Sequence, residues 1–277
     1  MNKWIFAAIF LLVGCTNSQN SSVVSPSGEA VIYGEDSRTE VSRNDVAYTL
    51  AQATAQFVNT AMTHFYSLGE SYPLCKNERF QNQTLLGFCS GVLIAPDKVL
   101  TAAHCVDDEE RCEFGQIVFG RSLENPNPPT YNCKSVVKID TKMDYAIIEL
   151  DRTVTDATPV TISSRTEITI GEPVLSLSYP LGLPLKQDKG HITATDFLGN
   201  SDYIKANVDT FSASSGSPLF DRHGELIGIL NRGEEDILED DIYRVKTQGG
   251  CVNFKRCKDG QCKGETFLKA SLISDKF

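Results

Sequence analysis

Short apolar runs separated by turn residues follow one another from about residue 84 onward. Residues 91–94 and 98–101 are two such runs, and Pro96-Asp97 between them is a turn signal. The same pattern predicts further strands over residues 116–119, 135–139, 145–150, 173–177, 190–194, 204–208 and 226–230. Many short strands joined by Gly and Pro turns are typical of an all-β protein built as a barrel or a sandwich.

The residues before these strands have a different pattern. Val46, Leu50 and Ala51 lie at helical spacing, with Ser42 or Asn44 as a candidate N-cap, so a short helix is predicted over 43–55. The polar stretch over residues 16 to about 30 is too poor in apolar residues to form a core. We therefore divide the chain into a signal peptide (1–15), a flexible tether (16–42) and a folded domain (43–277), with ordered structure expected to begin near Val31.

The first fifteen residues predict the compartment. Lys3 gives a positive start, residues 4–13 are apolar, and Gly14 and Cys15 follow, an arrangement typical of a cleavable signal and too short for a stable membrane span. The ending Leu-Val-Gly-Cys resembles the lipobox of bacterial lipoproteins, and the alternative is an ordinary signal peptide with a chance cysteine. The resemblance implies lipid on Cys15 and, because Thr16 follows, the outer membrane, on its periplasmic face or the cell surface. Several acyl chains anchor a protein stably, so we expect it to be attached to the membrane and not integral.

Composition limits the classes of binding partner and indicates the state of the cysteines. The chain has 277 residues, 41% of them apolar, and a net charge of -10, which argues against binding to nucleic acid. Of nine cysteines, eight remain if Cys15 carries lipid, and an even number in a secreted protein predicts four disulfides. We expect a Cys112–Cys133 pair and a Cys257–Cys262 pair; a zinc site formed by Cys251, Cys257 and Cys262 is the alternative.

Three segments contain residues typical of nucleophilic catalysis. They are Thr-Ala-Ala-His-Cys ending at Cys105, Asp-Tyr-Ala-Ile-Ile-Glu-Leu beginning at Asp144, and Ser-Ala-Ser-Ser-Gly-Ser-Pro around Ser215. Together they resemble the three motifs of the trypsin-like serine peptidases, in that family's order His, Asp, Ser, over roughly residues 84–232. A weaker likeness over 31–38 is to secreted peptidases of the glutamyl-endopeptidase type.

The resemblance implies a chymotrypsin-like fold of two six-stranded β-barrels, here with a short helical N-terminal extension, and a serine endopeptidase acting on proteins or peptides without a metal or other cofactor. His104 would be the general base, Asp144 would orient it, and Ser215 would be the nucleophile. Asp140 is the rival to Asp144, and Ser217 is excluded because Pro218 follows it. A Cys89–Cys105 disulfide is implied beside His104.

The oxyanion hole is the main departure from the family. The resemblance assigns it to the backbone N–H groups of Ser215 and Ala213, where the family usually has Gly at the position of Ala213. An alanine in a left-handed conformation costs roughly 1 kcal/mol. Ser214 stands where trypsin has the Asp that pairs with a new N-terminus, so we expect no activation of the trypsin type.

Three residues are candidates for the substrate pocket. Asp209 occupies the position that selects basic residues in trypsin, although a structural role for it is equally possible. Leu230 stands where glutamate-specific relatives have His, which argues against glutamate specificity, and Arg232 could contact an acidic side chain. The other hypotheses are an inactive or latent homologue that binds peptides in the envelope, kept open by Ala213, and a structural envelope lipoprotein.

Overall fold

The structure is a computed structural model that describes residues 31–59, 65–107, 109–113, 115–233, 244–246, 250–258, 262 and 264–276. The predicted signal peptide, Cys15 and residues 16–30 of the tether lie outside the described residues. Residues 31–42, the second part of the predicted tether, form part of the fold: they include two short strands, and Val31 and Ile32 are buried.

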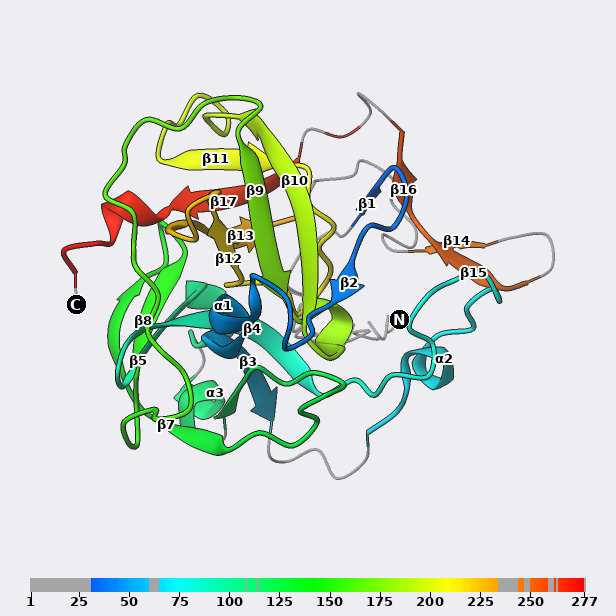
Figure 1. The fold of residues 1–277 in the computed structure, drawn as a ribbon, viewed down its shortest axis with the longest axis horizontal. Coiled ribbons are helices and arrows are strands. Elements are labelled where there is room, and N and C mark those ends of the chain that lie inside the picture. Colours follow the sequence, from blue (N-terminus) through cyan, green and yellow to red (C-terminus); the bar gives the residue numbers. More distant parts are fainter. Residues whose placement is uncertain are drawn as a thin grey trace, which may run out of the picture.

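Six antiparallel strands close the first barrel, which lies in the lower part of Figure 1. In barrel order they are β3 (Thr54–Asn59), β4 (Gly87–Ala95), β5 (Lys98–Thr101), β8 (Tyr145–Leu150), β7 (Thr130–Asp140) and β6 (Gly115–Phe119). Their inward side chains are apolar, and Leu93, Leu100 and Ile147 are fully buried. Apolar residues of β3, β4, β5, β6 and β8, with Tyr131 of β7, therefore form the core of this barrel.

The second barrel lies above the first in Figure 1. Its strands, in order, are β11 (Tyr203–Ala206), β17 (Glu265–Lys269), β13 (Leu226–Arg232), β12 (Pro218–Phe220), β9 (Pro173–Ser178) and β10 (Lys186–Ala194). Pairing of the C-terminal part of β10 with β11 closes the ring, and β2 (Thr39–Glu40) pairs with the N-terminal end of the same edge of β10. The predicted double six-stranded barrel is thus confirmed.

The remaining elements are short. They are β1 (Ile32–Tyr33), β14 (Arg244–Lys246), β15 (Val252–Phe254), β16 (Arg256–Cys257), α1 (Tyr48–Gln52), α2 (Leu68–Ser71), α3 (Glu109–Glu113) and the 3₁₀ turns η1 (Ala103–Cys105), η2 (Pro180–Gly182) and η3 (Ala270–Leu272). Strand β1 pairs in parallel with β16, on the right of Figure 1, so the first described strand lies beside the segment that contains Cys257. Among the described residues, no helix has the length and apolar character of a membrane span.

The N-terminal helix differs from its prediction. Helix α1 has only five residues, because the chain from Thr54 onward is recruited into β3 of the first barrel. Neither Ser42 nor Asn44 caps it: the cap is Ala47 without a side-chain hydrogen bond, and the Ser42 N–H is bonded to Asp45 in the preceding turn. Val46, which we placed at helical spacing with Leu50 and Ala51, precedes the helix and is exposed.

Four disulfides connect the described chain. Cys89–Cys105, Cys112–Cys133 and Cys257–Cys262 are the expected pairs, and Cys75–Cys251 is the fourth. The zinc alternative is wrong, because Cys251, Cys257 and Cys262 all belong to disulfides. Cys89, His104 and Cys105 lie close enough to suggest a metal site, but the disulfide between the two cysteines removes their thiolates.

Candidate active site

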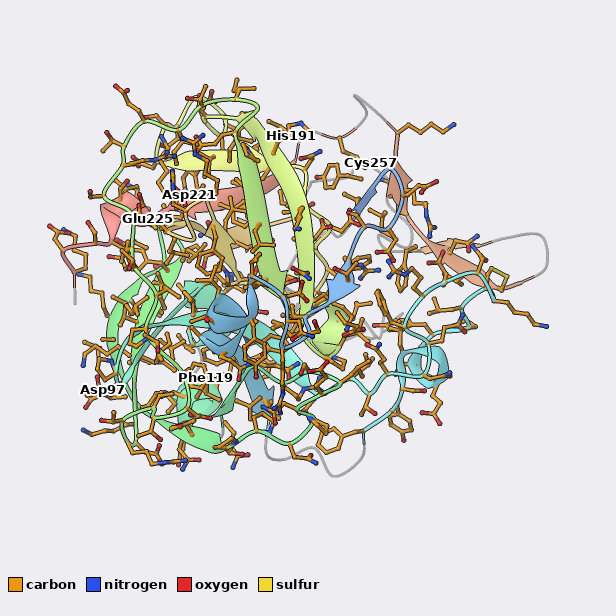
Figure 2. All side chains as sticks on the ribbon, in the orientation of Figure 1. Asp97, Phe119, His191, Asp221, Glu225 and Cys257 are labelled. Atoms are coloured by element: carbon orange, nitrogen blue, oxygen red, sulfur yellow. A yellow bond between two sulfur atoms is a disulfide. The ribbon has the colours of Figure 1, made fainter. Side chains whose placement is uncertain are left out.

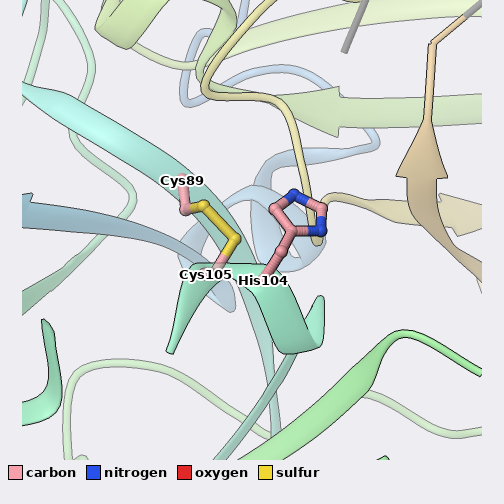
Figure 3. Close-up of side chains that lie close together, drawn as sticks. All are labelled: Cys89, His104 and Cys105. Carbon is pink, nitrogen blue, oxygen red and sulfur yellow. A yellow bond between two sulfur atoms is a disulfide. The ribbon is translucent and has the colours of Figure 1, made fainter. Parts of the chain in front are cut away.

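His104 lies where the first barrel faces the second. Strand β5 ends at Thr101, and the chain turns into η1 through Ala102, which is buried together with Ala103. Small side chains at these positions leave room for the imidazole. Figure 3 shows the Cys89–Cys105 disulfide beside His104, with the ring projecting away from it. The His104 carbonyl accepts a 2.6 Å hydrogen bond from Arg111 Nη1, which fixes the backbone of the turn.

Asp144 binds His104 on the Nδ1 side of the ring. Its Oδ2 and Oδ1 atoms lie 2.9 and 3.0 Å from Nδ1, and Oδ1 also accepts the His104 backbone N–H at 3.1 Å. Burial would raise the pKa of Asp144, but the hydrogen bonds and the charge of His104 outweigh it and leave the pKa below its usual range. An ionised Asp144 therefore selects the tautomer with hydrogen on Nδ1, leaving Nε2 free to accept a proton.

Asn231 holds Asp144 from the second barrel. Asp144 has a positive φ of 58°, a conformation that Asp tolerates better than most residues. The Asn231 Nδ2 donates to the carbonyls of Asp144 and Met143 at 2.7 and 3.2 Å, while its Oδ1 accepts the N–H of Leu268 at 2.7 Å. Asn231 was not predicted from the sequence, where its signal was a single amide side chain at the end of an apolar run.

Asp140 has a different role. Its Oδ1 accepts the N–H groups of Lys142 and Met143, at 3.1 and 3.0 Å, in the turn before β8. The structure thus brings Asp144, and not Asp140, to the imidazole.

The Ser215 loop, defined here as residues 209–217, is bonded to the first barrel. Ser90 is the main contact: its N–H donates to the Ser215 carbonyl at 2.8 Å and its Oγ to the Ala213 carbonyl at 2.8 Å. Gly216, with φ 80°, packs so tightly against Ser90 and Thr101 that a Cβ there would overlap both. These contacts, with Cys105 Sγ 3.7 Å from the Ser215 carbonyl, hold Ser215 beside the His104 turn.

The backbone at Ala213 is left-handed, as the motif requires, with φ 72°. Within the described part of the chain, the N–H groups of Ala213 and Ser215 have no hydrogen-bond acceptor, although both flank buried Ser214. Ser215 itself is half-buried, whereas Ser217 is fully buried and its Oγ has no partner among the described residues. The loop therefore presents Ser215 and two unused N–H groups, the combination that an oxyanion hole needs.

The three candidate pocket residues lie in different surroundings. Leu230 is buried on β13, where its carbonyl accepts the Gly216 N–H at 2.7 Å. Arg232 is exposed, with its guanidinium 5.7 Å from the Phe197 ring centroid. Asp209 is buried and its carboxylate accepts the backbone N–H groups of Tyr33 and Ser37 at 2.7 and 3.2 Å. The structure gives Asp209 the structural contacts that the sequence had left as one alternative.

The fold and the motifs define a trypsin-like class of protein, and the comparisons place the chain within it. Residues 89–229, more than half of the chain, match the family described as trypsin-like peptidase domain, so the chain belongs to that family. A probable periplasmic serine endoprotease DegP-like of Halomonas elongata is 26% identical over 217 residues, covering 76% of this chain and 42% of the relative. Glutamyl endopeptidase of Staphylococcus aureus (strain MRSA252) is 26% identical over 151 residues, covering 50% and 41%.

Solved structures agree on the fold. A Glu endopeptidase in complex with MPD has a TM-score of 0.53 at 20% identity, over 88% of this chain and 95% of that one. The MamO protease domain of Magnetospirillum magneticum has a TM-score of 0.53 at 12% identity, over 84% and 99%. The present chain spans about two-fifths of the length of the two curated relatives.

Proposed function

We propose that this protein is a serine endopeptidase that cleaves proteins or peptides through His104, Asp144 and Ser215 and an acyl-enzyme intermediate. The observation that carries the proposal is the paired His104 Nδ1 and Asp144 carboxylate beside a Ser215 loop in which the N–H groups of Ala213 and Ser215 have no acceptor among the described residues. Membership of the trypsin-like family supports the same chemistry.

The reaction follows from this arrangement. Nε2 of His104 takes the proton of the Ser215 hydroxyl as Oγ attacks the scissile carbonyl, and the N–H groups of Ser215 and Ala213 donate to the oxyanion. The imidazolium then protonates the leaving amine, and the acyl group remains as an ester on Ser215. Water repeats the sequence to release the acid. Asp144 stays ionised throughout and stabilises the imidazolium.

Labelling by a fluorophosphonate probe, together with casein cleavage, tests the proposal on the purified protein. We expect the wild type to be labelled and to cleave casein, and Ser215→Ala to do neither. Ser217→Ala is the matched control, since it removes a hydroxyl two residues away that is buried and has no partner among the described residues. A folded wild type that is not labelled would overturn the proposal in favour of the peptide-binding homologue.

We also propose that the protein acts outside the cytoplasm, anchored by lipid on Cys15, in the outer membrane of the envelope. The lipobox-like ending of the signal segment and the four disulfides support this, as does the similarity to the probable periplasmic serine endoprotease of Halomonas elongata. Incorporation of radiolabelled palmitate that is lost in Cys15→Ala is the expected result. Equal incorporation by the two proteins would contradict the anchor.

A further inference from the structure

Residues 32–40, called here the N-terminal strap, cover the buried side of the Ser215 loop. The strap begins at β1, which pairs with β16 beside Cys257, and ends at β2, which pairs with β10. Figure 2 labels Cys257 at this edge of the molecule. Both ends are therefore fixed by backbone pairing, and the residues between them face the loop.

The strap holds the first residue of the loop through its backbone. Tyr33 and Ser37 donate their N–H groups to the two carboxylate oxygens of Asp209, and the Asp209 N–H donates to Asp188 Oδ2 at 2.6 Å. The Ser37 hydroxyl donates to the other oxygen of Asp188. Asp209 lies six residues before Ser215, so these bonds fix the point from which the loop starts.

Arg38 contacts the third residue of the loop by its planar face. Its guanidinium carbon lies 4.3 Å from the centroid of the Phe211 ring, while Nε and Nη2 bind the Asp36 carboxylate at 2.9 and 2.7 Å. Arg38 is 1% exposed, and its Nη1 has no hydrogen-bond partner among the described residues. A buried guanidinium that is not fully satisfied costs stability, and a positioning role at Phe211 would account for its place here.

Phe211 is hydrogen-bonded to the part of the loop that contains left-handed Ala213. Its N–H donates to Ser214 Oγ at 3.2 Å and its carbonyl accepts the Ser214 N–H at 2.8 Å. These two bonds close the turn that contains left-handed Ala213 and leads directly into Ser215. A ring held in one position thus fixes the turn, and with it the two N–H groups assigned to the oxyanion.

We propose that Arg38 is a positioning residue, which sets the Ser215 loop in its reactive conformation by stacking on Phe211, so that the internal strap replaces an ion pair made by a newly cut N-terminus. This inference rests on the proposed function. It implies that the intact strap suffices for reactivity, and that no cut near residue 32 is required.

The test compares two arginines that both bind Asp36. Arg79 Nη1 donates to the Asp36 carbonyl at 2.8 Å and its guanidinium lies over Phe80, as that of Arg38 does, but it is partly exposed and has no contact with Phe211 among the described interactions. Arg38→Met and Arg79→Met are therefore a matched pair. For each variant the rate of fluorophosphonate labelling is measured over a range of probe concentrations. This separates the affinity for the probe in the reversible complex from the rate constant of the first-order reaction with Ser215. Folding is followed by circular dichroism.

A displacement of about 1 Å at a reacting group can cost up to roughly a hundredfold in rate, so we expect Arg38→Met to slow the first-order step at least about tenfold with its affinity unchanged. Arg79→Met should stay within about twofold of the wild type, and Arg38→Lys, which keeps the charge without the planar face, should resemble Arg38→Met. Phe211→Leu should slow the same step, and adding Arg38→Met to it should cause little further loss, because both changes remove one contact.

The outcomes separate this inference from the proposed function. A wild type without labelling defeats the proposed function, whatever the variants do. A labelled wild type with a folded Arg38→Met that reacts within about twofold of it, or that loses affinity alone, overturns the positioning role of Arg38. If Arg38→Met does not fold, Phe211→Leu decides: an unchanged first-order step in that variant overturns the inference, and a slowed step supports it.

Discussion

In the interior of the first barrel, Leu100 and Ile147 are fully buried among other apolar side chains, whereas the layer between the N-terminal strap and the Ser215 loop buries Arg38, Asp188 and Asp209. The barrel core depends on apolar burial, which is non-directional and insensitive to pH. The layer depends on hydrogen bonds and charges, which are directional and costly when incomplete. The first arrangement gives a scaffold for His104, and the second fixes one conformation of the loop that carries Ser215.

The largest expected effect on stability is in the barrel core. Ile147 lies on β8, three residues after Asp144, and its side chain has no exposed surface. Ile147→Ala should therefore lower the free energy of unfolding by about 2–5 kcal/mol. Urea unfolding at pH 5 and pH 8 should give the same loss at both values. Ile139→Ala on β7, where the side chain is 40% exposed, is the control and should cost less than about 0.5 kcal/mol. A loss that varied with pH would contradict a barrel core that depends on apolar burial alone.

The next effect belongs to the buried acids. Burial, followed by the charge of Asp188, raises the pKa of Asp209 to about 7, although the Tyr33 N–H and the charge of Arg38 act in the opposite direction. The pKa of an Asp in the unfolded chain is about 3.9, so between the unfolded and the folded pKa the folded protein binds more protons than the unfolded chain. The free energy of unfolding therefore falls as the pH rises toward 7. The contribution of Asp209 is thus complete below the unfolded pKa and is lost through the folded one.

Asp209→Asn removes this titration. Between pH 5 and pH 8 the wild type should lose about 1–3 kcal/mol more of its free energy of unfolding than the variant does. Asp36, Arg38 and Arg256 are present in both proteins and leave that difference unchanged only if the layer stays intact, so circular dichroism should accompany each urea titration. Asp188, whose charge raises the pKa of Asp209, loses that interaction in the variant, so the difference reports the Asp188–Asp209 pair. Parallel stability profiles for the two proteins would show that Asp209 does not titrate in this range.

The same contrast separates what could be predicted from the sequence. Runs with alternating or continuous apolar residues predicted β5 and β8 with the observed bounds, and motif resemblance predicted both barrels and the residues His104, Asp144 and Ser215. Strand β3 was missed because Ala51 and its neighbours also fit a helical period. Strand β17 was missed because the cysteine-rich segment before it offers no apolar run longer than three residues.

The layer between the N-terminal strap and the Ser215 loop was harder still to predict from the sequence. Nothing in the sequence around Arg38 distinguishes a buried arginine from an exposed one, since its burial depends on Phe211, which is 173 residues away. Asp209 has the same difficulty: its carboxylate accepts backbone N–H groups of the strap, and backbone groups carry no signal in the sequence. Directional contacts between distant segments therefore become visible only in the folded chain.

The smallest expected effect is at the point where the two regions meet. Ala213 is left-handed, which costs about 1 kcal/mol for an alanine, but Gly at the same place would lose about 0.5–1 kcal/mol through the greater freedom of the unfolded chain. Ala213→Gly should therefore change the free energy of unfolding by less than about 0.5 kcal/mol in urea. Because Ser90 already binds the Ala213 carbonyl and Phe211 closes the turn, the labelling rate should also stay within about threefold of the wild type.

A large rise in labelling rate in Ala213→Gly would mean that the alanine holds its N–H away from the oxyanion and that the strap does not overcome this. The matched measurement is Ala213→Gly combined with Arg38→Met. If the strap sets the conformation of the loop, Arg38→Met should lower the labelling rate more in the Ala213→Gly background than in the alanine background. Glycine gives the turn more alternative conformations once the Arg38 contact is lost. Equal losses in the two backgrounds would mean that the barrel contacts of Ser90 and Gly216 fix the loop without help from the charged layer.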